Sequence, residues 1–143
     1  MSTRCQIVVK DTHDTIVLYR HSDGYPDGEH GVPATIGAAL QYAWPLPRYE
    51  AMDFAAAIVR GLKESGGNIY IDGGGPNLEE KDFKAMLHGD IEWLYVVRMD
   101  GKQLVLDVHE VDGFGRDKQI IKSPTTLKFG EKWEGNAAMV ERS

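Results

Sequence analysis

The strongest constraint on the fold is a pair of apolar runs, IEWLYVVRM and KQLVLDVHEV, which flank Asp100 and Gly101. Alternating apolar residues predict strands, and an Asp-Gly pair between two such runs is typical of a tight β-hairpin. With this pair at the tip, one face of the hairpin is wholly apolar and the other is half polar, with Glu92 opposite His109. We expect the apolar face to join the core and the half-polar face to look outward or towards a cleft.

A second hairpin is predicted near the start of the chain. CQIVVK (residues 5–10) and TIVLYRH (residues 15–21) are rich in β-branched and aromatic residues, and the polar segment DTHD separates them. Side chains alternate across a strand, so Tyr19 and His21 share one face and Arg20 lies on the other.

Helical spacing of apolar residues appears in two segments between these hairpins. The first is GVPATIGAALQYAW (residues 31–44), and the second is RYEAMDFAAAIVRGLKESGG (residues 48–67). The predicted apolar stripe of the second helix consists of Met52, Ala55, Ala56, Val59 and Leu62.

Weaker patterns complete the chain. NIYID (68–72) predicts a strand and GGGP a loop. NLEEKDFKAMLHG (77–89) predicts a short helix that begins with a capping box between Asn77 and Glu80. KQIIKS (118–123) and TTLKF (125–129) predict two further strands. We therefore expect a single α+β domain over residues 1–143, in which an antiparallel sheet built from hairpins carries two to three helices packed on one face.

Charge and composition exclude several classes of function. The net charge of −6 argues against direct nucleic-acid binding, which needs clustered Lys and Arg. No run approaches the length of a membrane-spanning helix and the start is not a secretory signal, so we expect a cytoplasmic protein with no membrane partner. The one cysteine, Cys5, lies in an apolar run and is expected to be a small buried side chain.

The stretch YRHSDGYPDGEH (residues 19–30) concentrates most of the chemistry-bearing side chains. It has three interpretations. Asp-Gly and Pro-Asp-Gly are turn formers and need no ligand to explain them. His21, Asp23, Asp27 and His30 could instead hold a metal ion and serve a hydrolase, although their spacing matches no established metal motif.

The third interpretation is recognition of a ligand by residues at the end of a strand. Arg20 would supply charge to a phosphate or carboxylate, His21 and Asp23 hydrogen bonds, and Tyr25 stacking. Glu92 and His109 are candidate neighbours of this site.

A histidine beside carboxylates also suits proton transfer, and His109 shares the half-polar face with Asp107. A solvated charge pair between strands is the competing interpretation of this group.

The segments MSTRCQIVVK (1–10) and VLYRHSDGYP (17–26), with GDIEWLYVV (89–97), resemble a group of small uncharacterised proteins of bacteriophages and bacterial mobile elements. In that group a short β-hairpin runs into a Tyr-Arg/Lys-His-x-Asp-Gly-Tyr-Pro segment. The resemblance implies a phage context in the host cytoplasm, and it carries over Arg20, His21, Asp23, Gly24, Tyr25 and Pro26, with Asp90, Ile91 and Glu92.

We therefore expect a binding protein without turnover or cofactor. It would sequester a small anionic ligand, with nucleotide-like molecules among the candidates, or block a host protein, as in counter-defence. The site residues would be Arg20, His21, Asp23, Tyr25, Glu92 and His109. The alternative is the metal-dependent hydrolase, and homo-oligomerisation is left open.

Overall fold

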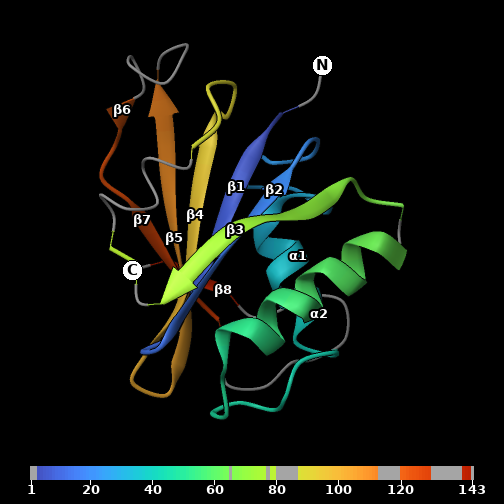
Figure 1. Ribbon diagram of the computed structural model, residues 1–143, viewed down its shortest axis with the longest axis vertical. Coiled ribbons are helices and arrows are strands. Elements are labelled where there is room, and N and C mark those ends of the chain that lie inside the picture. Colours follow the sequence, from blue (N-terminus) through green and yellow to red (C-terminus); the bar gives the residue numbers. More distant parts are fainter. Residues whose placement is uncertain are drawn as a thin grey trace.

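The computed structural model describes residues 3–64, 66–76, 78–79, 87–112, 120–129 and 140–142. Two helices and a series of strands follow one another along this part of the chain (Figure 1). Their bounds are β1 Cys5–Lys10, β2 Asp14–Arg20, α1 Val32–Ala39, α2 Ala51–Glu64, β3 Ile69–Pro76, β4 Trp93–Asp100, β5 Gln103–Asp112, β6 Ile120–Ile121, β7 Thr125–Phe129 and β8 Val140–Arg142.

The strands form a mixed, mostly antiparallel sheet in the order β3-β2-β1-β4-β5-β7-β8, with β6 paired to β5. Both predicted hairpins, β1–β2 and β4–β5, are antiparallel. The prediction of a wholly antiparallel sheet is wrong at its centre, where β1 pairs with β4 in parallel. Parallel neighbours need a long crossover, and here the chain between β1 and β4 includes β2, both helices and β3. The α+β class is confirmed.

The β4–β5 hairpin turns one residue later than the sequence predicts. Asp100 pairs with Gln103, so Gly101 and Lys102 form the turn, and Gly101 has a φ of 62°. A positive φ is easiest for glycine, which explains why Gly101 occupies the first turn position. Because the shift moves each partner by two residues, the composition of each face is unchanged, but Leu94 rather than Glu92 stands opposite His109.

The first face of the sheet shares one core cluster with both helices. This cluster joins alternate residues of the central strands to the buried residues of α1 and α2. In α2 those residues are Ala51, Phe54, Ala55, Ala57, Ile58 and Leu62. The predicted stripe is wrong at Met52 and Ala56, which are exposed, because the helix is rotated so that Phe54 and Ile58 face the core. Figure 1 shows α2 running alongside β3.

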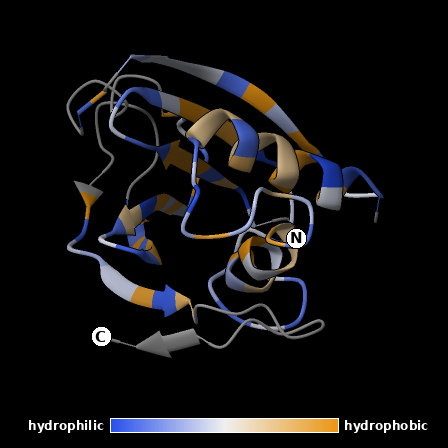
Figure 2. Ribbon diagram, turned by 90° about the horizontal axis from the view of Figure 1, so that it is seen from below, coloured by the Kyte–Doolittle hydropathy of each residue, from blue (hydrophilic) through white to orange (hydrophobic). Residues whose placement is uncertain are grey.

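The second face of the sheet carries a smaller apolar cluster interrupted by polar residues. Val8, Val17, Leu94 and Val96 belong to it. Figure 2 shows apolar and hydrophilic residues alternating along the strands, the pattern expected when the two faces differ. Buried Gln6 and Asp107 come from alternate positions of β1 and β5 on this second face.

The segment predicted as a glycine loop is part of a strand. β3 continues through Gly73, Gly74 and Gly75 to Pro76, and these residues pair with the first half of β2. A Cβ at Gly74 would lie 2.4 Å from the Thr15 carbonyl oxygen, so the close approach of the two backbones requires glycine there.

The helix predicted over residues 77–89, including its capping box between Asn77 and Glu80, lies mainly outside the described residues. Neither of the described helices is long and apolar enough to cross a membrane.

Candidate functional site

The stretch after β2 is a loop tied closely to the core. The Gly24 N–H donates to the Thr3 carbonyl at 2.9 Å, and the buried Tyr95 hydroxyl donates to the Gly24 carbonyl at 2.7 Å. A Cβ at Gly24 would lie 2.8 Å from the Cys5 Cβ, so only glycine fits at this position. The turn chemistry predicted from the sequence is therefore present, and it fixes a loop that reaches the start of α1.

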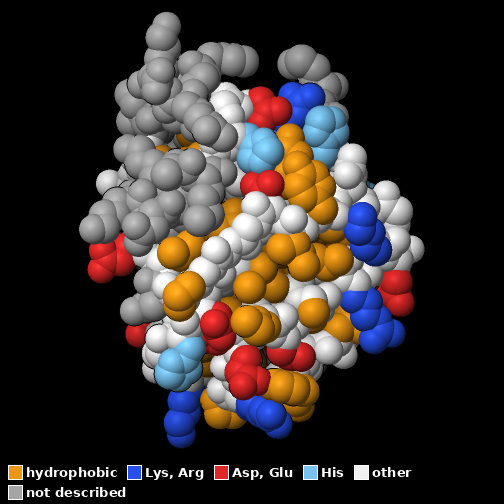
Figure 3. Space-filling model, viewed as in Figure 1, with side chains coloured by type: hydrophobic (Ala, Val, Ile, Leu, Met, Phe, Trp, Pro, Cys, Tyr) orange, Lys and Arg blue, Asp and Glu red, His pale blue; other side chains and the backbone are white. Residues whose placement is uncertain are grey.

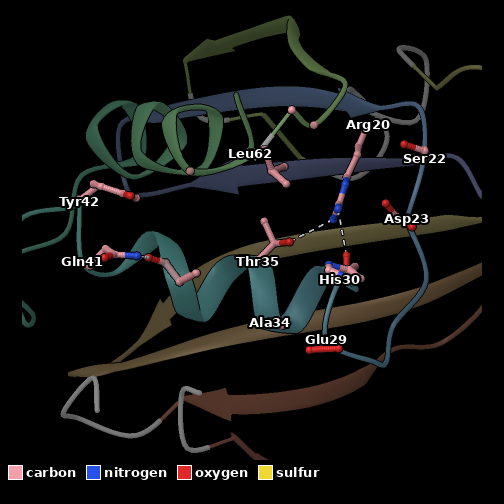
Figure 4. Close-up of a pocket in the computed structure, with 14 residues that line it drawn as sticks. Arg20, Ser22, Asp23, Glu29, His30, Ala34, Thr35, Gln41, Tyr42 and Leu62 are labelled. Atoms are coloured by element: carbon pink, nitrogen blue, oxygen red, sulfur yellow. Dashed lines mark hydrogen bonds between the residues drawn. The ribbon is translucent and has the colours of Figure 1, made fainter. Parts of the chain in front are cut away.

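This loop forms one wall of a cavity of about 390 Å³, which α1 and α2 complete (Figure 4). Polar residues of the loop and apolar residues of both helices line it. The lining side chains used below are those of Arg20, Ser22, Asp23, Glu29, His30, Ala34, Thr35, Ala38, Gln41, Tyr42 and Leu62.

Arg20 is the most deeply placed charge of this cavity. Its side chain is 4 % exposed, and the guanidinium donates to Thr35 Oγ1 at 3.1 Å and to the His30 carbonyl at 2.9 Å (Figure 4). No carboxylate in the described part of the chain lies within ion-pair distance of it. Burial lowers the pKa of the Arg20 guanidinium, which still stays protonated at neutral pH. The cavity thus holds a desolvated cation whose hydrogen-bond partners are neutral.

His21, the next residue, lies with a different group of side chains. Its Nδ1 accepts from Arg4 Nε at 3.3 Å and lies 3.3 Å from the Tyr19 hydroxyl. Arg4 also contacts Asp90, and the Tyr19 hydroxyl lies 3.4 Å from Asp90 Oδ2. His21 does not line the cavity that contains Arg20.

A second histidine lies near the same tyrosine. The His88 Nε2–H donates to Asp72 Oδ2 at 2.9 Å, and the rings of His88 and Tyr19 are 4.4 Å apart. Buried Gln6 donates to the same Asp72 oxygen at 2.8 Å. Histidine, acidic and basic side chains gather at the upper end of the molecule in Figure 3, above a patch of hydrophobic side chains. We call Arg4, Gln6, Tyr19, His21, Asp72, His88 and Asp90 the polar cluster of the second face.

The remaining predicted site residues are spread over the molecule. Tyr25 does not line the cavity, but its hydroxyl donates to Asp23 Oδ1 at 3.2 Å and holds that carboxylate. The exposed Glu92 and the half-buried His109 lie outside the cavity, and His109 Nδ1–H donates to the Lys122 carbonyl at 2.9 Å. Of the six predicted residues, the structure brings only Arg20 and Asp23 to one cavity.

The predicted metal ligands do not converge. Within the described ranges, which include His21, Asp23, Asp27 and His30, no group of three or more His, Cys, Asp or Glu side chains is placed to hold a metal ion. The first of these residues joins the polar cluster, whereas Asp23 and His30 line the cavity.

Sequence reasoning missed the helical half of the cavity. Thr35, Gln41 and Tyr42 line it, and they come from α1 and the turn after it. One signal was present in the sequence, because a glycine inside a helix is unfavourable and indicates close packing. Gly61 of α2 lies beside the Tyr42 ring, where an added Cβ would be in ordinary contact at 3.5 Å, so the glycine indicates the place of the packing and is not required by it.

No protein-family model, no curated protein and no solved structure significantly matches the chain. Its function is therefore inferred from the geometry of the described residues.

Proposed function

We propose that the chain is a binding protein without turnover, which sequesters a small anionic ligand in the cavity beside Arg20. The observation that carries this proposal is Arg20, a residue that is 4 % exposed and whose guanidinium has only neutral hydrogen-bond partners in the described part of the chain. Taking a charge out of water costs several kcal/mol unless an opposite charge compensates it. An anion in the cavity would supply that charge, with charge-assisted hydrogen bonds from the Arg20 N–H groups that have no partner among the described residues.

The cysteine supports a role in binding rather than nucleophilic catalysis. Cys5 is fully buried, and burial raises the pKa of its thiol to about 12. A thiol with that pKa is neutral at physiological pH and is a poor nucleophile.

The cellular context of the proposal comes from the resemblance to phage proteins. It would place the ligand in the cytoplasm of an infected host, where sequestration could serve counter-defence. The proposal also takes both helices to cover the same face of the sheet, which their shared core cluster supports.

Calorimetric titration of the purified chain with inorganic phosphate, acetate and adenosine monophosphate tests the anion site. We expect at least one probe to bind. Arg20→Met should lower the affinity for that probe by roughly 100-fold, the range for removing a buried charged partner. Arg20→Lys should bind with intermediate affinity, because it keeps the charge and loses the planar fork.

Arg48→Met is the matched control, because Arg48 is an exposed arginine that stacks on Trp44 away from the cavity. The affinity of the Arg48→Met variant for the anion should equal that of the parent chain. Unchanged binding by a folded Arg20→Met variant, or no Arg20-dependent binding of any ligand that carries a carboxylate or phosphate group, would contradict the proposal.

A second candidate function is the blocking of a host protein, and the edge strand β3 favours it. Tyr70 is 44 % and Ile71 is 66 % exposed, although both are large hydrophobic residues. β3 is the terminal strand of the sheet, and the His21 N–H donates to the Asn68 carbonyl. By the alternation of an antiparallel ladder, the N–H and C=O groups of Ile69 and Ile71 point away from β2. Such an edge can add a strand from a partner.

Photo-crosslinking in host cells tests this second candidate. A crosslinker at Ile71 should capture one host protein, whereas the same group at Met52, which is 59 % exposed on α2, should not. Ile71→Lys should prevent the capture, because lysine on an edge opposes strand addition. Equal capture at both positions would remove this candidate, and capture of a second copy would replace the host partner by self-association.

A further inference from the structure

The charges that line the Arg20 cavity are not all of one sign. Asp23 and Glu29 line it together with Arg20. Figure 4 shows Asp23 on the segment after β2, on the same side as the Arg20 guanidinium, and Glu29 on the loop just before α1. The cavity therefore presents one buried cation and two carboxylates at the same end.

One of these carboxylates is held in place by the loop. Asp23 has a φ of 57°, a conformation that Asp and Asn adopt more readily than most residues. The Tyr25 hydroxyl donates to its Oδ1. Asp23 is exposed and lies beyond ion-pair distance of Arg20, although its charge raises the pKa of that guanidinium against the larger effect of burial. The two opposite charges thus stand near each other without forming a pair.

The rest of the cavity is suited to an uncharged chain of moderate length. Three apolar residues of α1 and α2 line it, namely Ala34, Ala38 and Leu62. Gln41 and Tyr42 lie at the end opposite to Ser22 and Asp23 (Figure 4). The Tyr42 hydroxyl donates to Glu64, which fixes the ring at that end.

We propose that this cavity binds a zwitterion of the α-amino-acid class. The ligand carboxylate lies at Arg20, the ammonium group lies at Asp23 and Glu29, and the side chain extends between the helices towards Gln41 and Tyr42. This inference rests on the anion site proposed above and names the class of its ligand. An α-amino acid carries a carboxylate and an ammonium group on one carbon. These two charges match the Arg20 guanidinium and the nearby carboxylates, which do not form an ion pair with each other.

The same charges disfavour a phosphate group. A phosphate carries up to two negative charges at neutral pH, and both Asp23 and Glu29 would repel it. The described lining has two rings on which a base could stack, those of His30 and Tyr42, so repulsion of the phosphate is what disfavours a nucleotide. A zwitterion has no net charge, so it gains from Arg20 without opposing the two carboxylates.

The test begins with thermal-shift measurements of the full chain against the twenty standard L-amino acids, inorganic phosphate and adenosine monophosphate. The amino acid that gives the largest shift is then titrated by calorimetry beside its N-acetyl form, which lacks the cation, and its amide form, which lacks the anion. We expect each derivative to bind roughly 10- to 100-fold more weakly, the range for losing a hydrogen bond to a charged group.

Variants of the two carboxylates give an independent readout. Asp23→Asn keeps a residue that tolerates the positive φ. It should lower the affinity for the amino acid roughly 10-fold, and it should reduce the ratio between this affinity and that for the N-acetyl form. Glu29→Gln should act in the same direction. Glu92→Gln is the matched control, because Glu92 is an exposed glutamate outside the cavity, and it should change nothing.

The outcomes separate this inference from the function on which it rests. Binding of phosphate or the N-acetyl form as tightly as any amino acid, with loss in Arg20→Met, overturns the zwitterion and leaves the anion site standing. Binding of phosphate alone has the same meaning. If no probe binds in an Arg20-dependent way, both proposals fall.

Discussion

At the end of β2, two consecutive residues lie on opposite faces of the sheet, and the two faces give them different environments. Arg20 lies on the face that shares a core cluster with both helices, is 4 % exposed, and is held by Thr35 and a backbone carbonyl. His21 passes to the other side and is half-buried beside Tyr19 and Arg4. One position therefore lines a cavity and the next belongs to a partly solvated polar network.

The difference teaches how a strand distributes a cluster of chemistry-bearing residues. Alternation sends successive side chains to opposite faces, so closeness in sequence separates residues here instead of bringing them together. The loop that follows stays on the first face, since Asp23 lines the cavity and Gly24 packs against Cys5 of the first cluster. The functional differences between the faces can be tested by substitutions that affect one and spare the other.

The largest effect is expected where the loop is anchored to β1. Gly24→Val should lower the free energy of unfolding by about 2–3 kcal/mol, because its Cβ would lie 2.8 Å from both the Cys5 Cβ and the Thr3 carbonyl oxygen. Urea denaturation measures the change. Gly24→Ala adds only the Cβ and should already cause most of this loss; a Gly24→Ala variant as stable as the parent chain would mean that packing against β1 is not the cause.

The second face contains a charged pair that should make stability depend on pH. Burial opposes ionisation of Asp107, but hydrogen bonds from Arg98 at 2.7 Å and Thr126 at 2.7 Å hold its pKa below the ordinary value. Asp107→Asn should cost about 1–2 kcal/mol at pH 7, discounted because Arg98 is partly exposed.

The sign follows from the lowered pKa. A carboxyl group whose folded-state pKa is depressed stabilises the protein above its unfolded pKa of about 3.9, and this contribution is lost as the pH falls through the folded value. Thermal unfolding between pH 7 and pH 2.5 should therefore show the difference between Asp107→Asn and the parent chain shrinking below about pH 4. A difference that grows on acidification would refute the assignment.

A smaller effect is expected from the polar cluster of the second face. Asp72→Asn weakens the hydrogen bonds from Gln6 and His88 and should cost about 1 kcal/mol. Binding to the Arg20 cavity should stay unchanged, since Asp72 does not line it. Chemical denaturation and calorimetry of the same sample check both statements, and a loss of binding would join the two faces functionally.

The smallest effect is expected for His21→Ala. Its contacts with Arg4 and Tyr19 are long, at 3.3 Å each, so the stability should change by less than about 0.5 kcal/mol. Ligand affinity should stay within about twofold of the parent value, in contrast to Arg20→Met. If both variants lost binding equally, the interpretation of a single site with Arg20 and His21 side by side would be restored.

Local patterns predicted the local structure well and the long-range structure poorly. The alternation of side chains correctly predicted that Tyr19 and Arg20 lie on opposite faces of the sheet, and both predicted hairpins are present. The parallel pairing of β1 with β4 was not foreseen, because nothing in either segment specifies a partner so distant in the chain. The continuation of β3 through its glycines was also missed, since glycine disfavours strands unless a neighbouring backbone approaches closely.

The candidate site was predictable only on its loop side. Arg20 and Asp23 could be predicted because binding residues often lie where a strand runs into a loop. Thr35 and Tyr42 were missed because a cavity between a loop and two helices depends on how the helices pack. That packing depended on the rotation of α2, which the apolar pattern misassigned at Met52 and Ala56.

The contact between Gly24 and Cys5 provides a natural probe of the cavity wall. The chain has one cysteine, which is buried and whose Cβ lies against the Gly24 segment of the loop. The rate at which a thiol-specific reagent labels the unmodified protein would then report how often the loop detaches. A bound ligand that bridges loop and helices would slow this labelling, so occupancy could be followed without attaching a fluorophore or changing any residue.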